Sequence, residues 1–478
     1  MLYKPKSWYR QRYNRRIFLQ QLALGAGGLA MLSACQPAAA PAPQPQTAAP
    51  AAGEPHSEWV TGKLSRDATG TFSYTSWEGE AEMRKWLFHF DNFFKENYPN
   101  ITVNADWGVP WGEYWTKLPT QLAGGAPIDM CWMHDTRVKT FAANGWLMPL
   151  DDFLSAFPPI GWPEEFYPSQ VAAFQYQGQQ YGFPYDWAPG GLYINVDMFE
   201  EAGLEIPTEE TTMEEFLELA LALTQDTDGD GEIDRWGCDV PTSWAAGTYW
   251  VVKNYGGDFW DEEVTVSRFD QAGTIAAYQF IADLMWEHKV MPTAEMLGAM
   301  GMGTGLAFSN GLIGMHWSLN DEAFVLDETI AGKFRWTVAP SPRGEAGRFQ
   351  FVGGSAFSIP TSSTQPDLAY ELMRYTLSSP ETLPVSGEMG SQFVGNKNYY
   401  EYGLPSEEMG EVREAFKHAM YDLGLRDGVV PDYHPKYLEW ESTVYVTVMD
   451  TLWTGEERDA AAACQRVHEM TNELLAQV

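Results

Sequence analysis

Basic side chains are scarce in this chain. Its 478 residues hold 30 Lys and Arg against 65 Asp and Glu, which gives a formal net charge of −35. Several of those basic residues lie in the first 34 positions, where there is no acid, so the remainder is more acidic still. A surface of this sign repels phosphate backbones and anionic lipid. The composition therefore argues against nucleic acid or an anionic membrane surface as a partner.

Long hydrophobic runs are also missing from the sequence. The apolar stretch at residues 22–32 is too short to span a membrane and follows a cluster of basic residues, so it predicts a signal peptide over residues 1–34. The segment NRRIFL resembles a twin-arginine export motif, and LSAC resembles a lipobox that ends at Cys35. We expect cleavage before Cys35 and lipidation of its thiol, which would anchor the chain outside the cytoplasm. The alternative is an ordinary signal peptide with an accidental cysteine.

Large apolar side chains are nearly absent from residues 36–56, which consist mainly of Pro, Ala and Gln. Such a segment favours extended conformations and has little with which to form a core. We therefore expect residues 35–66 to comprise the lipidated cysteine and a tether.

Cysteine itself is rare. If Cys35 is lipidated, an odd number remains, namely Cys131, Cys238 and Cys464. Cys131 and Cys464 stand at apolar positions of their segments. These features favour buried free thiols over a disulfide or a metal set.

What the chain has in quantity is aromatic residues, 14% of the total, within alternating strand and helix patterns. This alternation predicts open, mainly parallel sheets with flanking helices. Thr212 and Glu215 have capping-box spacing before one helix, and Asp270 is expected to cap another. Pro119 is expected to kink or shorten the helix that contains it.

Several segments together resemble the bacterial extracellular solute-binding proteins of the carbohydrate-binding kind. They are YGFPYDWAPGGLYINVDMFEEAGL at 181–204, WGEYWTKLPTQLAGGAPIDM at 111–130, FAANGWLMPLD at 141–151, FSNGLIGMHW at 308–317 and FVGGSAFSIP at 351–360. The resemblance runs from about residue 73 to 383. It implies a periplasmic-binding-protein-like α/β fold, in which two lobes joined by a hinge close on a ligand, and a monomer that delivers the ligand to an ABC transporter permease. We expect the lobes to comprise residues 67–187 with 353–408 and residues 188–352 with 409–478.

The resemblance also implies ligand contacts. WMHD is similar to a motif of the maltose-binding members, whose tryptophan and aspartate correspond to Trp132 and Asp135. Other candidates lie at strand ends, along the crossing strands or in aromatic segments that match the family. They are Trp77, Glu78, Tyr185, Asp186, Trp187, Trp244, Trp317, Gly354 and Trp440. For each tryptophan the alternative is a core position, and for each acid it is a solvated or capping carboxylate.

The string DTDGDGEID carries the most specific metal pattern. Calcium prefers several oxygen ligands at about 2.4 Å, and alternate carboxylates around a glycine turn supply them. The predicted ligands are Asp226, Asp228, Asp230, Glu232 through its backbone carbonyl, and Asp234. The closing acid of an EF-hand loop is missing, because Gly237 occupies that position. The alternatives are completion by a distant carboxylate, a weak site, or a metal-free polar turn.

The function that the sequence predicts is capture of a sugar or oligosaccharide, without catalysis and without a required cofactor. Aromatic faces would stack on sugar rings, and acids would accept hydrogen bonds from hydroxyls. Within the same fold, a polyamine or a phosphate ester is the alternative ligand. A secreted glycoside-acting enzyme is the alternative from another class, although no nucleophile motif supports it.

Overall fold

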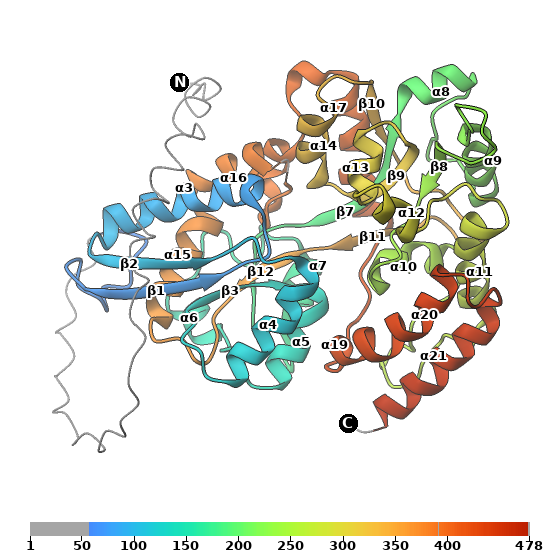
Figure 1. Cartoon of the computed structure of the whole chain (residues 1–478). Helices are drawn as coiled ribbons and strands as arrows, with labels where there is room; N and C mark the ends of the chain where they lie inside the picture. The colour runs from blue at the N-terminus through green and yellow to red at the C-terminus, as the bar shows by residue number, and fades with distance from the viewer. Residues whose placement is uncertain (1–56, 391, 477–478) are drawn as a thin grey trace, which may run out of the picture. The chain divides into compact units, whose positions relative to one another are not determined.

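The chain passes between two β-sheets on antiparallel strands. In the computed structural model, which describes residues 57–390 and 392–476, β6 (Phe183–Pro184) belongs to the first sheet and β7 (Ala188–Asn195) to the second. β11 (Gln350–Gly353) and β12 (Ser355–Ser358) return the chain and pair antiparallel with β7 and β6. Figure 1 shows β7 and β11 side by side between the sheets. The crossover predicted at residues 181–204 is confirmed.

The first sheet has the strand order β2-β1-β3-β12-β6. Its remaining strands are β1 (Gly70–Thr75), β2 (Ile101–Asp106) and β3 (Met130–His134). The first three strands are parallel, whereas β12 runs antiparallel to both β3 and β6. The prediction of a mainly parallel sheet is therefore wrong, because the returning strand enters from the opposite direction.

The second sheet has the order β13-β11-β7-β9-β8, and β10 also pairs with β7. Its remaining strands are β8 (Trp236–Asp239), β9 (Ile313–Leu319), β10 (Trp336–Ala339) and β13 (Gly428–Val429). This sheet is mixed as well. The crossing strand β7 is antiparallel to β9, β10 and β11, whereas β8 is parallel to β9 and β13 to β11. A separate two-stranded ribbon is formed by β4 (Gln175–Tyr176) and β5 (Gln179–Gln180).

Helices flank both sheets. With the first sheet lie α3 (Glu80–Asn97), α4 (Trp111–Ala123), α5 (Asp135–Ala143), α6 (Asp151–Ala156), α7 (Pro168–Ala173), α15 (Pro366–Ser378), α16 (Thr382–Gly390) and the 3-10 helix η1 (Lys397–Gly403). The second sheet's side holds α8 (Val196–Ala202), α9 (Met213–Leu223), α10 (Ala245–Asn254), α11 (Ala272–Trp286), α12 (Ala294–Ala299), α13 (Thr304–Ser309), α14 (Glu322–Ile330), α17 (Glu411–Phe416), α18 (Leu423–Asp427), α19 (Tyr437–Trp440), α20 (Val446–Trp453) and α21 (Ala460–Leu475). The π-helical turns η3 (Lys417–Asp422) and η4 (Glu441–Tyr445) and the 3-10 turn η2 (Glu407–Met409) connect the last group. Within residues 57–390 and 392–476, no helix has the length and apolar character needed to cross a membrane.

Local sequence signals at helix ends match the structure in part. The capping box is present, because Thr212 Oγ1 accepts the Glu215 backbone N–H and a Glu215 carboxylate oxygen accepts that of Thr212. α4 continues for four residues beyond Pro119, so the proline does not end it. The cap prediction for Asp270 is wrong. Gln271 precedes the helix without a side-chain cap, and Oδ1 of Asp270 lies 3.4 Å from Nδ1 of His468 instead.

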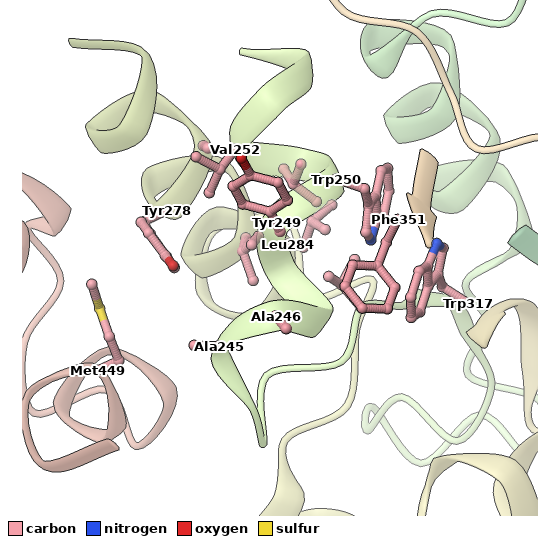
Figure 2. Close-up of a cluster of buried hydrophobic side chains, with 14 of the residues drawn as sticks. Ala245, Ala246, Tyr249, Trp250, Val252, Tyr278, Leu284, Trp317, Phe351 and Met449 are labelled. Carbon is pink, nitrogen blue, oxygen red and sulfur yellow. The ribbon is translucent and has the colours of Figure 1, made fainter. Parts of the chain in front are cut away.

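Each sheet has its own aromatic core, and both lie within one compact unit, Ala51–Val478. In the second core, Figure 2 shows Trp250 of α10 beside Trp317 and Phe351. The indole rings of Trp250 and Trp317 stack with centroids 6.0 Å apart. The free thiols of Cys131, Cys238 and Cys464 are buried, as predicted.

The two sheets, each with its own core and flanking helices, confirm the two-lobed α/β architecture. Residues 1–34, Cys35 and most of the predicted tether lie outside the described residues.

Candidate functional site

A cavity of about 720 Å³ lies where the strands cross between the two sheets. This volume is typical of a small-molecule site. From the first lobe it is lined by Trp77, Glu78, Gly79, Glu82, Lys85, Trp111, Gly112, His134, Tyr185, Asp186, Gly354, Ser355, Met389 and Gln392. From the second lobe it is lined by Ala188, Ser243, Trp244, Leu319, Asp321, Phe324 and Val325.

Strand ends deliver most of these side chains. Trp77 and Glu78 follow β1, His134 ends β3, and Leu319 ends β9. Open α/β sheets place ligands at the carboxyl ends of their strands, because loops and helix starts meet there. At the returning crossover, a Cβ on Gly354 would lie 2.2 Å from Oε1 of Gln170. The same Cβ would lie 3.0 Å from the backbone oxygen of Asp186 in the other crossing segment, so glycine lets the two segments approach closely.

Aromatic rings form one wall of the cavity. Trp77 meets Trp111 edge to face, with centroids 5.2 Å apart and ring planes at 84°. The ring of His134 lies 5.2 Å from Trp111 and 6.2 Å from Trp244, which comes from the second lobe. Trp111 keeps 36% of its surface exposed. Apolar ring faces of this kind suit the C–H face of a ligand.

Glu78 is held rigidly in the floor of the cavity. Nε1 of Trp86 donates to Oε2 of Glu78 at 2.6 Å, and the Tyr185 hydroxyl donates to Oε1 at 2.8 Å. Burial, with the Glu78 and Asp186 carboxylates nearby, raises the pKa of Tyr185 well above its usual value, so the hydroxyl keeps its proton. A carboxylate has several lone pairs, so Glu78 still has acceptor capacity toward a ligand.

A polar chain crosses the cavity floor beside it. Nζ of Lys85 donates to Oε1 of Gln392, and Nε2 of Gln392 donates to Oδ2 of Asp186, each at 2.8 Å. The backbone N–H of Ser355 donates to the other oxygen of Asp186. Burial nevertheless raises the pKa of Asp186 well above its usual value. Among the described cavity-lining residues, Lys85 is the one Lys or Arg.

Asp321 brings an acid from the second lobe at the start of α14. Burial raises the pKa of Asp321 to about 6, and the charge of Glu322 adds to the rise. The charges of Glu78, Glu82 and Lys85 also act on it. The cavity therefore carries carboxylates on both lobes and few cations.

Six predicted ligand contacts line the cavity: Trp77, Glu78, Tyr185, Asp186, Trp244 and Gly354. Their role in binding stays a prediction.

Trp132 and Trp317 do not reach the cavity, contrary to expectation. Trp132 is fully buried on β3 against Phe357, and Trp317 is 2% exposed on β9. In each strand the residue two positions later, His134 or Leu319, lines the cavity instead. Two residues of strand span about 6–7 Å. The tryptophans thus lie on the correct face of the strand but too deep in the sheet.

Trp187 and Trp440 are core residues as well, so the structure corrects their placement. Trp187 is 2% exposed and stacks on Tyr167 with centroids 4.5 Å apart, and neither ring lines the cavity. Trp440 packs among aromatic rings of the second core, where its Nε1 donates to Oγ1 of Thr471 at 2.8 Å.

Asp135 lies just beyond the cavity, at the start of α5. Its side chain is fully buried, with Oδ1 2.9 Å from Nδ1 of His134. Oδ2 has no hydrogen-bond partner among the described residues.

The sequence reasoning missed several lining residues. Trp111, His134 and Asp321 could have been found by extending each predicted strand to its carboxyl end. Glu82 and Lys85 lie in the first turns of the helix after β1, where the same rule applies. Met389 and Gln392 carried no signal, because they lie beyond the segments that resemble the family.

The acidic loop brings three of its predicted ligands together. One carboxylate oxygen each from Asp226, Asp228 and Asp230 lies within 4.8 Å of the others. Asp234 is not part of this cluster, and its two oxygens accept the backbone N–H and the hydroxyl of Thr227. The backbone carbonyl of Glu232 was the remaining predicted ligand. Three clustered carboxylates suit a hard cation such as calcium, and its presence stays a prediction.

Comparison with known proteins places the chain in a family. It belongs to the bacterial extracellular solute-binding proteins, whose family pattern matches residues 77–382. This membership places the protein outside the cytoplasm. The resemblance stated from the sequence is thereby confirmed.

Individual relatives are distant. The arabinooligosaccharide-binding protein of Halalkalibacterium halodurans is 24% identical over 322 residues, which cover 62% of this chain and 67% of that protein. The maltotriose-binding protein of Pyrococcus abyssi is 22% identical over 176 residues, 36% of this chain and 34% of that one. Such alignments span between a third and two thirds of the relatives.

Solved structures share the fold over most of the chain. An ABC substrate-binding protein of Listeria monocytogenes in complex with cycloalternan has a TM-score of 0.75 at 20% identity, covering 86% of this chain and 100% of that one. The GacH receptor of Streptomyces glaucescens, solved unliganded and with acarbose, has a TM-score of 0.71 at 22% identity. The match covers 86% of this chain and 99% of that receptor. At these identities the likeness concerns the fold.

Proposed function

We propose that this protein captures an oligosaccharide between its two lobes and delivers it to an ABC importer. The observation that carries the proposal is the cavity itself, where indole rings from both lobes face carboxylates from both lobes. Sugars present apolar faces and a rim of hydroxyls, and this combination matches both. Relatives named for arabinooligosaccharide and maltotriose support the same ligand class.

Lobe closure is the proposed mechanism of capture. The connections that cross between the sheets are short, at residues 185–187 and at Gly354, so they suit a hinge. Beyond the cavity, Oδ2 of Asp135 and Nε and Nη1 of Arg137 are buried without hydrogen-bond partners among the described residues. Such groups are costly to bury, and opening the lobes would return them to water. A ligand that stabilises the closed form more than the open one drives closure.

The proposal includes binding without chemistry. Glu78 is already held by two donors, and Asp186 is held by Ser355 and Gln392, so both acids are fixed as hydrogen-bond acceptors. Incubation with chromogenic glycosides should release no dye. Turnover of any of them would favour a glycoside-acting enzyme instead.

Membrane attachment is proposed through the lipidated thiol of Cys35, on the basis of the LSAC sequence alone. A permease of an ABC transporter is the proposed protein partner, and the protein is proposed to act as a monomer. In cells, the chain should fractionate with membranes, and Cys35→Ala should release it. If the wild-type chain and Cys35→Ala both stayed with the membranes, or if both were released, the lipid anchor at Cys35 would be contradicted.

A thermal-shift panel tests the ligand class. We expect arabinotriose, maltotriose or mannotriose to raise the melting temperature, since a tight ligand stabilises the folded state by mass action. Spermidine and glucose 6-phosphate serve as the competing arms. A response to spermidine alone would favour a polyamine, which the acids of the cavity would suit. A response to the phosphate alone would be unexpected with a single cavity lysine and would overturn the proposal.

A further inference from the structure

A buried histidine outside the cavity faces two acids. Nδ1 of His316 lies 2.8 Å from Oδ1 of Asp239, and Nε2 lies 3.0 Å from Oε2 of Glu322. His316 is in β9, and Asp239 is its register partner at the end of β8. Glu322 is the first residue of α14. One ring therefore bridges the sheet and the start of a helix.

The two contacts define the protonation state of the ring. An ionised carboxylate only accepts hydrogen bonds, so both ring nitrogens must donate. Neutral imidazole has a single N–H, whereas imidazolium has two. Burial lowers the pKa of His316, but the charges and hydrogen bonds of Asp239 and Glu322 outweigh it and raise the value to about 10. The imidazolium in turn lowers the pKa of Glu322, against the effect of burial.

The surroundings keep the Asp239 contact dry, whereas the side chain of Glu322 is 34% exposed. His316 is 2% exposed and Asp239 1% exposed. Phe308 of α13 stacks on the imidazole at 5.4 Å, and Tyr193 of β7 lies 6.2 Å away on the neighbouring strand. A Cβ on Gly305 would lie 2.7 Å from Oε1 of Glu322, so α13 leaves that carboxylate little freedom.

The helix that starts at Glu322 forms part of the cavity wall. Asp321, Phe324 and Val325 line the cavity, and Asp321 has no side-chain cap hydrogen bond of its own. His316 does not line the cavity, so it acts on these residues through Glu322. We propose that His316 is a doubly protonated positioning residue, whose bridge between Asp239 and Glu322 holds the second-lobe wall in its ligand-binding position. This inference rests on the proposed binding function.

Among the described residues, few charged or titratable groups face His316. They are Asp239 from β8, Glu322 and the neighbouring Asp321 from α14, and the Tyr193 hydroxyl from β7, which donates to the Leu319 carbonyl. Because the pKa is raised, the stability that the bridge contributes is fully present below pH 6.5 and is lost as the pH rises through about 10, where the folded ring loses its second proton. Ligand affinity should decline over the same alkaline range.

Nitrogen NMR of the histidine-labelled protein tests the protonation state without a ligand. At pH 7.5 both ring nitrogens of His316 should show the protonated signature. One protonated and one bare nitrogen would overturn the proposal. Because this measurement needs no sugar, it separates failure of the bridge from failure of the proposed function, which would show as no binding by the wild-type protein.

Binding variants test the positioning role, with the panel oligosaccharide that gives the largest thermal shift as probe. His316→Gln has one NH2 group and one carbonyl oxygen, so it can donate toward only one of the two acids and should weaken binding of the probe about tenfold. His418→Gln, on an exposed histidine, is the matched control and should bind as wild type. Equal affinity of folded His316→Gln and wild type would overturn the proposal.

Glu322→Gln separates charge from position. The amide oxygen of the introduced glutamine still accepts a hydrogen bond from Nε2 of His316, so the Kd at pH 7 should stay within about threefold of the wild-type value. Glu322→Ala removes that acceptor and should weaken binding by more. Because one charge is gone, the pH at which affinity falls should move from near 10 toward neutral. An unmoved pH profile would contradict the bridge even if His316→Gln failed to fold.

Discussion

Nη2 of Arg137, in helix α5 of the first lobe, donates a hydrogen bond to Oε2 of Glu441, which follows α19 and packs with the second lobe. Oε1 of Glu441 accepts the backbone N–H of Ala245 at 3.2 Å, at the start of α10. Both charged side chains are buried. The pair therefore ties the two lobes together beside the cavity, next to the helix whose preceding residue, Trp244, lines it.

Removing the charge of Arg137 should weaken ligand binding. Methionine at this position keeps most of the length but leaves the Glu441 carboxylate unpaired, which costs roughly 3–5 kcal/mol in a buried pair. Part of that cost falls on the closed form alone, since opening would hydrate Glu441. We expect Arg137→Met to raise the Kd of the panel oligosaccharide about tenfold by calorimetry.

A second ion pair between the same lobes supplies the control. Nζ of Lys139 contacts Oδ1 of Asp432, but the side chain of Asp432 is 61% exposed. Exposed pairs contribute about 0–1 kcal/mol, so Lys139→Met should change the Kd by less than about threefold. A double-mutant cycle with Glu441→Gln should show strong coupling for Arg137. Additive effects of Arg137→Met and Glu441→Gln would contradict a direct interaction between the two side chains.

Replacing the ring of Trp244 should cost affinity, because it is the indole that the second lobe contributes to the cavity wall. A stacking ring is worth about 0.5–1.5 kcal/mol beyond the area that it buries, so Trp244→Ala should raise the Kd by at least about 2- to 10-fold, while Trp244→Phe should raise it less. Trp286→Phe, in the same lobe outside the cavity, is the control. An unchanged Kd in Trp244→Ala would place the ligand elsewhere.

Where sequence reasoning succeeded, the information was local. The 181–204 segment contains its own strand, turn and helix signals, so the crossover could be located to within a few residues. The first strand end gave Trp77 and Glu78 for the same reason. The prediction for Trp132 and Trp317 was wrong by two residues along the strand. Where a strand ends depends on its neighbouring strands, which its own residues do not specify. Gln392 could not be predicted, since only tertiary packing brings it against Asp186.

Asp321 should make stability depend on pH. Its pKa is raised to about 6 in the folded protein. As the pH rises from about 4 to about 6, the unfolded chain therefore loses this proton before the folded protein does, and the free energy of unfolding falls. With solvent screening the cost is roughly 1 kcal/mol above pH 6. Without ligand, Asp321→Asn should therefore melt about 1–2 °C above wild type at pH 7.5 and level with it at pH 4. Glu328→Gln, exposed on the same helix, should match wild type at both values, and equal melting of all three proteins at pH 7.5 would contradict the shift.

Calcium should stabilise the protein through the Asp226–Asp230 loop. A site with Kd near 0.1 mM, typical of extracellular modules, would contribute about 2 kcal/mol in 5 mM calcium. The melting temperature should rise by a few degrees over that in EDTA, and magnesium should do less, because its octahedral geometry fits a flexible loop poorly. Asp228→Asn with Asp230→Asn removes two of the three clustered carboxylates and should abolish the response. Glu232→Gln keeps the backbone carbonyl that was predicted to bind, so it should respond as wild type. A melting temperature that is the same in calcium and EDTA would instead identify the loop as a metal-free turn, held by the bonds from Gly229 and Gly231 to Asp226.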